Sequence, residues 1–119
     1  MIVLDTDHLS ILQRANSPAA QRLFDRLNTA TEPVTVTIIS AEELMRGWLA
    51  AIHKERDLNK QIAPYLRLKN LFRFFAAWSV LEWNAIAVKE MENLRSRRLR
   101  LGTMDLKIAA ITLSHHAQP

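Results

Sequence analysis

The sequence predicts an α/β fold in which a small parallel sheet is flanked by helices. Two apolar stretches with β-branched residues, 1–4 and 34–39, are typical of buried strands, and a third strand is expected over 78–83. Helical patterns separate these strands, so the strands should pair in parallel as they do in layered α/β domains. Ligands of such sheets bind beyond the carboxyl ends of the strands, and functional side chains are expected there.

Short polar caps mark the elements that follow the first strand. Thr6 or Asp7 is expected to cap a short helix that runs to Arg14. A second helix should begin at Ser17-Pro18, because serine is a favoured N-cap and proline suits the first helical turn. These signals place two helices between the first strand and the second.

The second strand, 34–39, ends at Ser40, which we expect to cap a long helix over 41–57. A further helix is expected over 59–77, with Pro64 near its start. The helices on this side of the second strand therefore precede the third strand.

The last third of the chain should hold one strand and two helices. After the strand, Asn84 is expected to cap a helix that runs to about Arg97. A basic link follows, and Thr103 should cap a last helix over 104–117. The order along the chain supports one layered domain over residues 1–119.

Composition bounds the function. The chain has 119 residues, 49% of them hydrophobic, which suffices for one packed core. It has no cysteine, which excludes disulfides, thiolate catalysis and cysteine-based zinc sites. No signal peptide or membrane-spanning run is visible, so we expect a soluble cytoplasmic protein. The net charge of +4 is compatible with a polyanionic partner.

Three carboxylates lie at the ends of predicted elements. The first two, Asp5 and Glu43, should meet at the carboxyl edge of the sheet, and Asp105 can join them if the last helix begins on the same side. Asp5 ends the first strand, Glu43 lies near the start of the helix after the second, and Asp105 near the start of the last helix. Two like charges ~4 Å apart repel by about 4 kcal/mol at an effective dielectric near 20. A cluster would therefore need a bound cation, shared protons or nearby basic residues, and oxygen ligands suit Mg²⁺ or Mn²⁺.

Each acid also has a purely structural interpretation. Asp5 can accept hydrogen bonds from the following helix, and Asp105 suits the positive end of a helix dipole. Ser40 and Glu43 match the S-x-x-E capping box. Glu42 points about 100° away from Glu43 round the helix and is expected to be peripheral.

Three motifs in register resemble the PIN-domain nucleases, and among them the VapC-like toxins of type II toxin–antitoxin pairs. VLDTDHLS resembles the opening motif of that family, and TIISAEELMRG resembles the second, which selects Glu43 as the site acid. LGTMDLKIAAITLSHHA resembles the third and supplies Asp105. The resemblance runs along the whole chain.

This resemblance implies a Mg²⁺- or Mn²⁺-dependent ribonuclease with a PIN-like three-layer fold. Asp5, Glu43 and Asp105 would hold the metal, and Thr6 and Asp7 would orient those ligands by hydrogen bonds. The implied partners are an RNA substrate, a cognate antitoxin and a second copy of the chain in a homodimer.

The resemblance also has a departure. Members of the family continue past the third motif into another strand and a further acid, whereas this chain stops at Pro119. On this comparison the last strand or strands are missing and the domain is truncated at its C-terminus. A second hypothesis is therefore a catalytically impaired PIN-like module that binds an antitoxin or RNA.

A third hypothesis is a phosphotransferase of the haloacid-dehalogenase type, since VLDTD also fits a strand followed by D-x-D. Asp5 would then be the nucleophile and Asp7 the acid and base. The chain has His8-Leu9 where that family has Gly and then Thr or Val, and it lacks a later Asp-Asp pair. We give this hypothesis the least weight.

A basic stretch precedes the third acid and is a candidate RNA contact. A positive rim beside an acidic pocket suits a phosphodiester backbone, whereas the structural alternative is a solvated helix end. The residues concerned are Arg95, Arg97, Arg98, Arg100 and Lys107. The aromatic residues could stack on bases, but packing in the core or a dimer is favoured for Trp48, Phe72, Phe74, Phe75 and Trp78.

Overall fold

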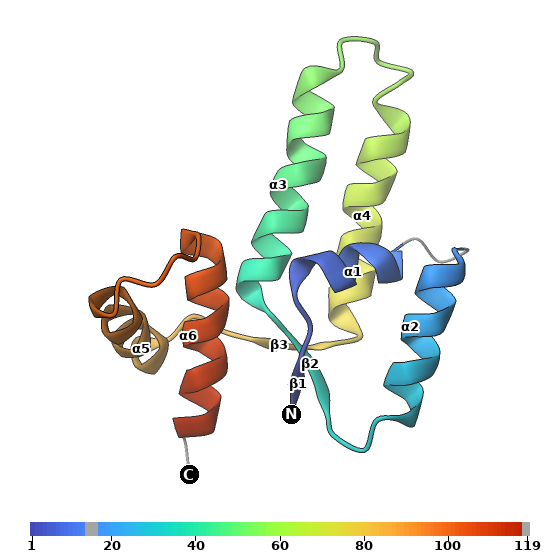
Figure 1. The fold of residues 1–119 in the computed structure, drawn as a ribbon. Helices are drawn as coiled ribbons and strands as arrows, with labels where there is room; N and C mark the ends of the chain where they lie inside the picture. The colour runs from blue at the N-terminus through green and yellow to red at the C-terminus, as the bar shows by residue number, and fades with distance from the viewer. Residues whose placement is uncertain (14–16, 118–119) are drawn as a thin grey trace.

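A parallel sheet of three short strands organises the fold. The structure, a computed structural model, describes residues 1–13 and 17–117. The strands are β1 (Ile2–Val3), β2 (Val34–Thr37) and β3 (Ser79–Leu81), in the spatial order β1-β2-β3. Both pairings are parallel (Figure 1). The predicted α/β class with a small parallel sheet between helices is confirmed, and each strand is shorter than its apolar run.

Two helices follow β1. Helix α1 (Thr6–Gln13) is capped by Asp5, whose Oδ1 accepts the backbone N–H of His8 at 2.9 Å, so the expected cap at Thr6 or Asp7 is wrong. Its expected end at Arg14 lies outside the described residues. Helix α2 (Pro18–Thr29) begins as predicted, with the Ser17 side chain accepting from the backbone of Ala20.

Helix α3 (Ile38–Lys54) begins earlier than the sequence indicated. The N-cap is Thr37, whose hydroxyl accepts the backbone N–H of Ser40 at 3.2 Å. The predicted cap at Ser40 is therefore wrong, and so is the capping-box interpretation of Glu43, which lies in the second turn. A threonine at the strand end offers the new helix its cap and stops β2 there.

The remaining helices match the predicted order with shorter bounds. Helix α4 (Ile62–Ala76) holds Pro64 in its first turn, as expected. Helix α5 (Ala85–Ser96) is capped by Asn84, which confirms that prediction. Helix α6 spans Thr103–Ala117, so Thr103 lies within the helix that it was expected to cap.

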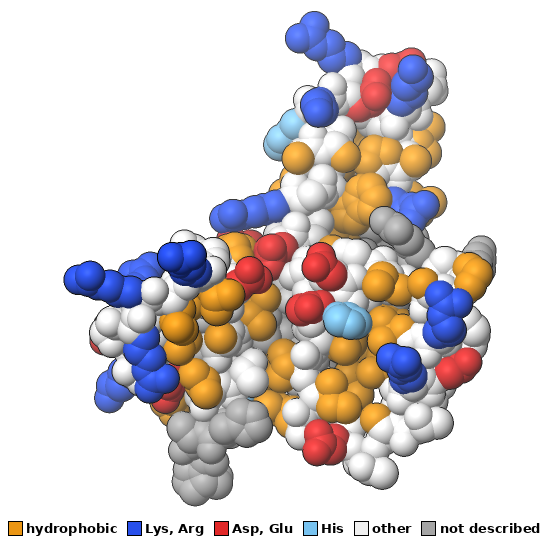
Figure 2. All heavy atoms as spheres, in the orientation of Figure 1, with side chains coloured by type: hydrophobic (Ala, Val, Ile, Leu, Met, Phe, Trp, Pro, Cys, Tyr) orange, Lys and Arg blue, Asp and Glu red, His pale blue; other side chains and the backbone are white. Residues whose placement is uncertain are grey.

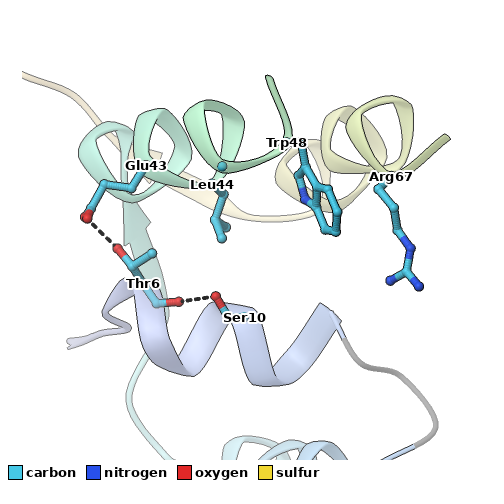
Figure 3. A pocket seen from close by; sticks show the side chains of 7 residues that line it. Thr6, Ser10, Glu43, Leu44, Trp48 and Arg67 are labelled. Carbon is cyan, nitrogen blue, oxygen red and sulfur yellow. Dashed lines mark hydrogen bonds between the residues drawn. The ribbon is translucent and has the colours of Figure 1, made fainter. Parts of the chain in front are cut away.

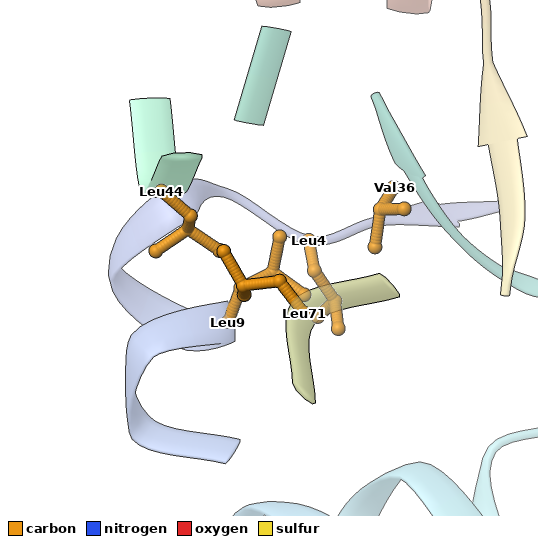
Figure 4. Packing of buried hydrophobic residues seen from close by; sticks show 5 residues of the cluster. All are labelled: Leu4, Leu9, Val36, Leu44 and Leu71. Atoms are coloured by element: carbon orange, nitrogen blue, oxygen red, sulfur yellow. The ribbon is translucent and has the colours of Figure 1, made fainter. Parts of the chain in front are cut away.

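Alternate residues of the strands face two separate cores. Figure 4 shows the first, in which Leu4, Leu9, Val36, Leu44 and Leu71 pack together between the sheet and helices α1, α3 and α4. The second core, on the other face, joins the sheet to the helices of the C-terminal third through Ile39, Leu81, Ala87 and Ile111. The molecule thus has three layers, with the sheet in the middle (Figure 1).

Helices α3 and α4 form an antiparallel pair that extends beyond the sheet (Figure 1). Strand β1 lies at one edge of the sheet, and the described residues contain no fourth strand beside it. Over the same residues, none of the helices has the length and apolar character needed to span a membrane. The carboxyl ends of the strands lead into α1 and α3, and this edge is where the candidate site lies.

Candidate functional site

The ends of β1 and β2 are joined by a side-chain hydrogen bond. Thr6 begins α1, separated from β1 by Leu4 and Asp5, and its hydroxyl donates to Glu43 Oε1 at 2.8 Å. Glu43 comes from α3, which follows the second strand. Parallel strands end at the same edge of a sheet, so two residues far apart in sequence meet there. The structure thus brings Thr6 and Glu43 together, while their proposed roles at a metal site stay a prediction.

A line of hydroxyl groups continues this contact into the protein interior. Thr6 Oγ1 lies 3.2 Å from Ser40 Oγ, and Ser40 Oγ lies 3.5 Å from Thr37 Oγ1. Ser40 and Thr37 are completely buried. Buried hydroxyls without partners are costly, so these hydrogen-bonded hydroxyl groups fix the start of α3 against α1. They also hold the Thr6 hydroxyl in place for Glu43.

Asp5 is exposed and is held by His8. Its Oδ1 accepts the backbone N–H of His8 at 2.9 Å and lies 2.6 Å from His8 Nδ1. Partial burial raises the pKa of Asp5, but the hydrogen bonds and charge of His8 outweigh it and lower the pKa below its ordinary value. The structural interpretation of Asp5 as a helix cap is thus confirmed, and among the residues that the structure describes no side chain hydrogen-bonds its second carboxylate oxygen.

The other acids differ in their surroundings. Asp105 is exposed in the first turn of α6, a helix in contact with α3. Asp7 is exposed in the first turn of α1. Glu42 forms an ion pair of 2.6 Å with Arg46 one turn further along α3, in keeping with its predicted peripheral role.

The fit of these acids to a divalent cation depends on their donor atoms and on their arrangement. Asp5, Glu43 and Asp105 supply only oxygen atoms, which suits Mg²⁺ or Mn²⁺. However, within residues 1–13 and 17–117 no three or more Asp, Glu or His side chains lie close enough together to hold a metal ion. The donor chemistry fits and the arrangement does not, so the set of three ligands stays a prediction.

A pocket of about 460 Å³ adjoins the contact between Thr6 and Glu43. Helices α1, α3 and α4 form its walls, and Figure 3 shows side chains of α3 and α4 pointing toward α1. Glu43 lies at one end, and Trp48 and Arg67 lie at the other. The remaining lining residues are Ser10, Leu44 and Gly47. The pocket is large enough for a small organic ligand.

The predicted basic contacts lie beside the acidic edge. Acidic side chains gather near the base of α3, and Lys and Arg side chains gather over the adjoining C-terminal helices (Figure 2). All four arginines, Arg95, Arg97, Arg98 and Arg100, are exposed. Lys107 is only half exposed, and its ammonium lies 5.7 Å from the centre of the Trp83 ring. Their contact with RNA stays a prediction.

Two residues of the site were not foreseen. The sequence predicts no role for His8. It lies three positions after Asp5, so its backbone N–H reaches the capping carboxylate and its ring contacts the same oxygen. Ser40 was assigned as a cap, and its hydroxyl instead lies near Thr6. The aromatic prediction holds in part: Phe74, Phe75 and Trp78 pack on the core, whereas Phe72 is 61% exposed.

Comparisons with known proteins identify similar folds. No family model and no curated protein matches the chain. Among solved structures, VapBC2 of Rickettsia felis bound to a promoter DNA fragment has a TM-score of 0.68 at 19% identity, over 98% of this chain and 84% of that one. DNA-bound VapBC of Salmonella typhimurium gives 0.71 at 21% identity, over 97% and 82%. FitAcB of Neisseria gonorrhoeae gives 0.66 at 22% identity, over 98% and 83%.

These findings correct the family assignment. The three motifs led us to identify the chain as a PIN-domain ribonuclease of the VapC-like toxins, and that assignment is wrong as stated. The similar structures are complexes that contain the antitoxin VapB as well as VapC, and identities of 19–22% show the fold alone. The chain therefore has the PIN-type α/β fold found in such complexes, with a small parallel sheet flanked by helices.

Proposed function

We propose that this chain is a component of a toxin–antitoxin pair that hydrolyses RNA with the help of Mg²⁺ or Mn²⁺. One observation carries the proposal. Thr6, which directly follows Asp5 in the sequence, hydrogen-bonds Glu43 at the carboxyl edge of the sheet. Both residues line an open pocket. In α/β folds, ligands bind at this edge of the sheet, so carboxylates there are in a position to take part in chemistry. The fold shared with VapBC and FitAcB structures supports the toxin–antitoxin role.

The proposed ligands of the cation are Asp5, Glu43 and Asp105. Asp5 Oδ1 and Glu43 Oε1 already have partners in His8 and Thr6, so cation binding requires these side chains to rearrange. Thr6 would keep the Glu43 carboxylate oriented, and the neighbouring Asp7 would also orient the ligands by hydrogen bonds. The arginines before α6 and Lys107 would contact the phosphates of the RNA.

The proposed protein partners are an antitoxin and a second copy of the chain. The outer part of the α3–α4 pair exposes large apolar side chains to solvent, and a partner surface would cover them. The residues concerned are Leu58, Ile62, Tyr65 and Leu66, which are 54–78% exposed.

The test is an RNA cleavage assay on the purified chain with Mg²⁺, Mn²⁺ or EDTA. We expect cleavage only with a divalent cation, and a loss of about 100-fold or more in Asp5→Asn, Glu43→Gln and Asp105→Asn. Glu42→Gln is the matched control, because it removes the neighbouring carboxylate that pairs with Arg46. Absence of cleavage with both cations, together with no rise in melting temperature, would contradict the proposal.

One observation favours a second candidate function, a binding module without catalysis. The described residues offer no preformed group of three metal-binding side chains. Such a module would bind RNA or an antitoxin with the same affinity in EDTA and in Mn²⁺, and would not cleave RNA. Metal-dependent turnover that Asp5→Asn abolishes would exclude it.

A further inference from the structure

The pocket between α1, α3 and α4 contains an aromatic ring that serves two purposes. Trp48 is half-buried and packs with part of its surface against the first core. It also lines the pocket, where Figure 3 shows its ring directed toward α1. A tryptophan held by the core on one side presents a rigid apolar surface on the other, and that surface suits a flat aromatic ligand.

An arginine adjoins this ring and is available for an anion. The guanidinium of Arg67 lies 5.8 Å from the centre of the Trp48 ring, near the outer limit of a cation–π contact. Arg67 is exposed, and no carboxylate of the described residues lies within ion-pair distance of it. A guanidinium in this position can turn to a phosphate group without breaking an existing ion pair.

The pocket is open over Gly47. This residue lines it from α3, and a Cβ built at this position would meet no heavy atom within 4 Å apart from its chain neighbours and its own helix. Gly47 is itself exposed, so the pocket is accessible from solvent at this residue. The pocket ends at Glu43 and Thr6, whose side chains form a hydrogen bond with each other.

We infer that this pocket binds one unpaired nucleotide of a single-stranded RNA. Its base lies against Trp48, and its phosphate is held by Arg67, at the end of the pocket opposite the Glu43 carboxylate. Stacking on an aromatic ring combined with a cation for the backbone is how proteins bind single strands without sequence preference. The inference rests on the proposed ribonuclease function, because it names where the substrate of that function binds.

The test measures binding without catalysis. A short fluorescein-labelled single-stranded RNA of mixed sequence is titrated with the protein in EDTA, and its fluorescence anisotropy gives Kd. We expect Trp48→Leu to weaken binding by about tenfold, as expected for the loss of one base stack, and Trp48→Phe to retain it. Arg67→Gln should weaken binding and lower the slope of log K against log salt by ~0.7, the value for one phosphate of a single strand.

Gly47→Leu tests most directly whether RNA binds in this pocket. A Cβ at this position meets no atom beyond its chain neighbours and its own helix, and replacing a helical glycine raises helix propensity, so we expect this variant to fold. The melting temperature should equal or exceed that of the wild type, while RNA binding falls about tenfold because the pocket is filled. Gly47→Ala adds only a Cβ and should bind RNA with nearly wild-type affinity.

Matched controls come from α4. Phe72→Leu removes another exposed aromatic ring, and Arg73→Gln removes another exposed arginine of the same helix. Neither residue lines the pocket, so both variants should bind RNA within about twofold of the wild type, well below the effect of a lost stack. A single strand that is abasic throughout, and an RNA duplex, should both bind more weakly than the labelled RNA.

The outcomes separate this inference from the proposed function. If wild type binds RNA and Gly47→Leu, Trp48→Leu and Arg67→Gln bind equally well, the pocket is not the RNA site, whether or not cleavage occurs. If an arginine-rich peptide binds in a Trp48-dependent manner and RNA does not, the pocket takes a protein segment and the inference fails. If the wild type binds no RNA in EDTA, the inference is also overturned, and cleavage assays with Mn²⁺ still decide the function.

Discussion

Thr6 Oγ1 donates a hydrogen bond of 2.8 Å to Glu43 Oε1, and this contact joins the helix after β1 to the helix after β2. It gives the candidate site its position at the carboxyl edge of the sheet. The same threonine lies beside the buried Ser40 hydroxyl, so the orientation of Glu43 depends on polar groups of the interior.

Thr6→Val should destabilise the protein by about 1 kcal/mol, because a side chain of nearly the same shape replaces the hydroxyl and leaves Ser40 with fewer partners. Urea denaturation followed by circular dichroism measures the change. Thr6→Ser keeps the hydroxyl and should lose less. Equal stability of Thr6→Val and the wild type would show that the contact contributes nothing to the fold.

The pKa of Asp5 should depend on His8. His8 lowers the pKa of this carboxyl in the folded protein. At pH values above the ordinary pKa of 3.8, the interaction therefore stabilises the fold in full, and this stabilisation is lost as the pH falls through the lowered pKa. In His8→Ala the Asp5 pKa should rise, which ¹³C NMR of the side-chain carboxyl in metal-free protein can follow. His53→Ala, at an exposed position on α3, should leave it unchanged.

Leu71→Ala should be strongly destabilising. Leu71 is completely buried in the core that joins α1, α3 and α4 to the sheet (Figure 4). Truncation of such a leucine leaves a cavity and costs about 2–5 kcal/mol. The matched control is Leu66→Ala on the same helix, because Leu66 is 54% exposed. Urea midpoints that shift equally for both variants would contradict this account of the core.

Arg98→Gly should stabilise the protein by about 1 kcal/mol. Arg98 follows the last turn of α5 with a φ of 52°, a left-handed conformation in which glycine avoids the steric cost of a Cβ. Arg95→Gly, within the same helix, should have the opposite sign because glycine is unfavourable in helices. Thermal unfolding at matched ionic strength distinguishes the two, and a lower melting temperature for Arg98→Gly would contradict the prediction.

The sequence predicted the order of elements because β-branched runs and polar caps are local signals. Ser17 and Asn84 cap their helices as expected. The boundary of β2 was missed because Ile38 and Ile39 favour a strand in isolation, whereas the Thr37 cap starts a helix that buries Ile39 against the second core. A tertiary contact decided the structure of these two residues.

The candidate site was predictable only in part. The order of elements placed Asp5 and Glu43 at one edge of the sheet, whereas the role of Thr6 came only from the family resemblance; the structure shows Thr6 bonded to Glu43. Whether Asp105 joins Asp5 and Glu43 depends on how α6 packs across the sheet. The sequence around Asp105 does not determine the angle at which that helix packs. The contact between His8 and Asp5 depends on a side-chain rotamer, which hydrophobic periodicity does not encode.

The α3–α4 pair that extends beyond the sheet has a consequence for folding. Its helices are neighbours in sequence, so their contacts close only a short loop, whereas β1 and β3 must each find β2 across helical segments. We expect the helical hairpin to form early and the strands to pair late. Glu43, near the base of the hairpin, would meet Thr6 only in that last step, so the candidate site would be completed by the slowest event of folding.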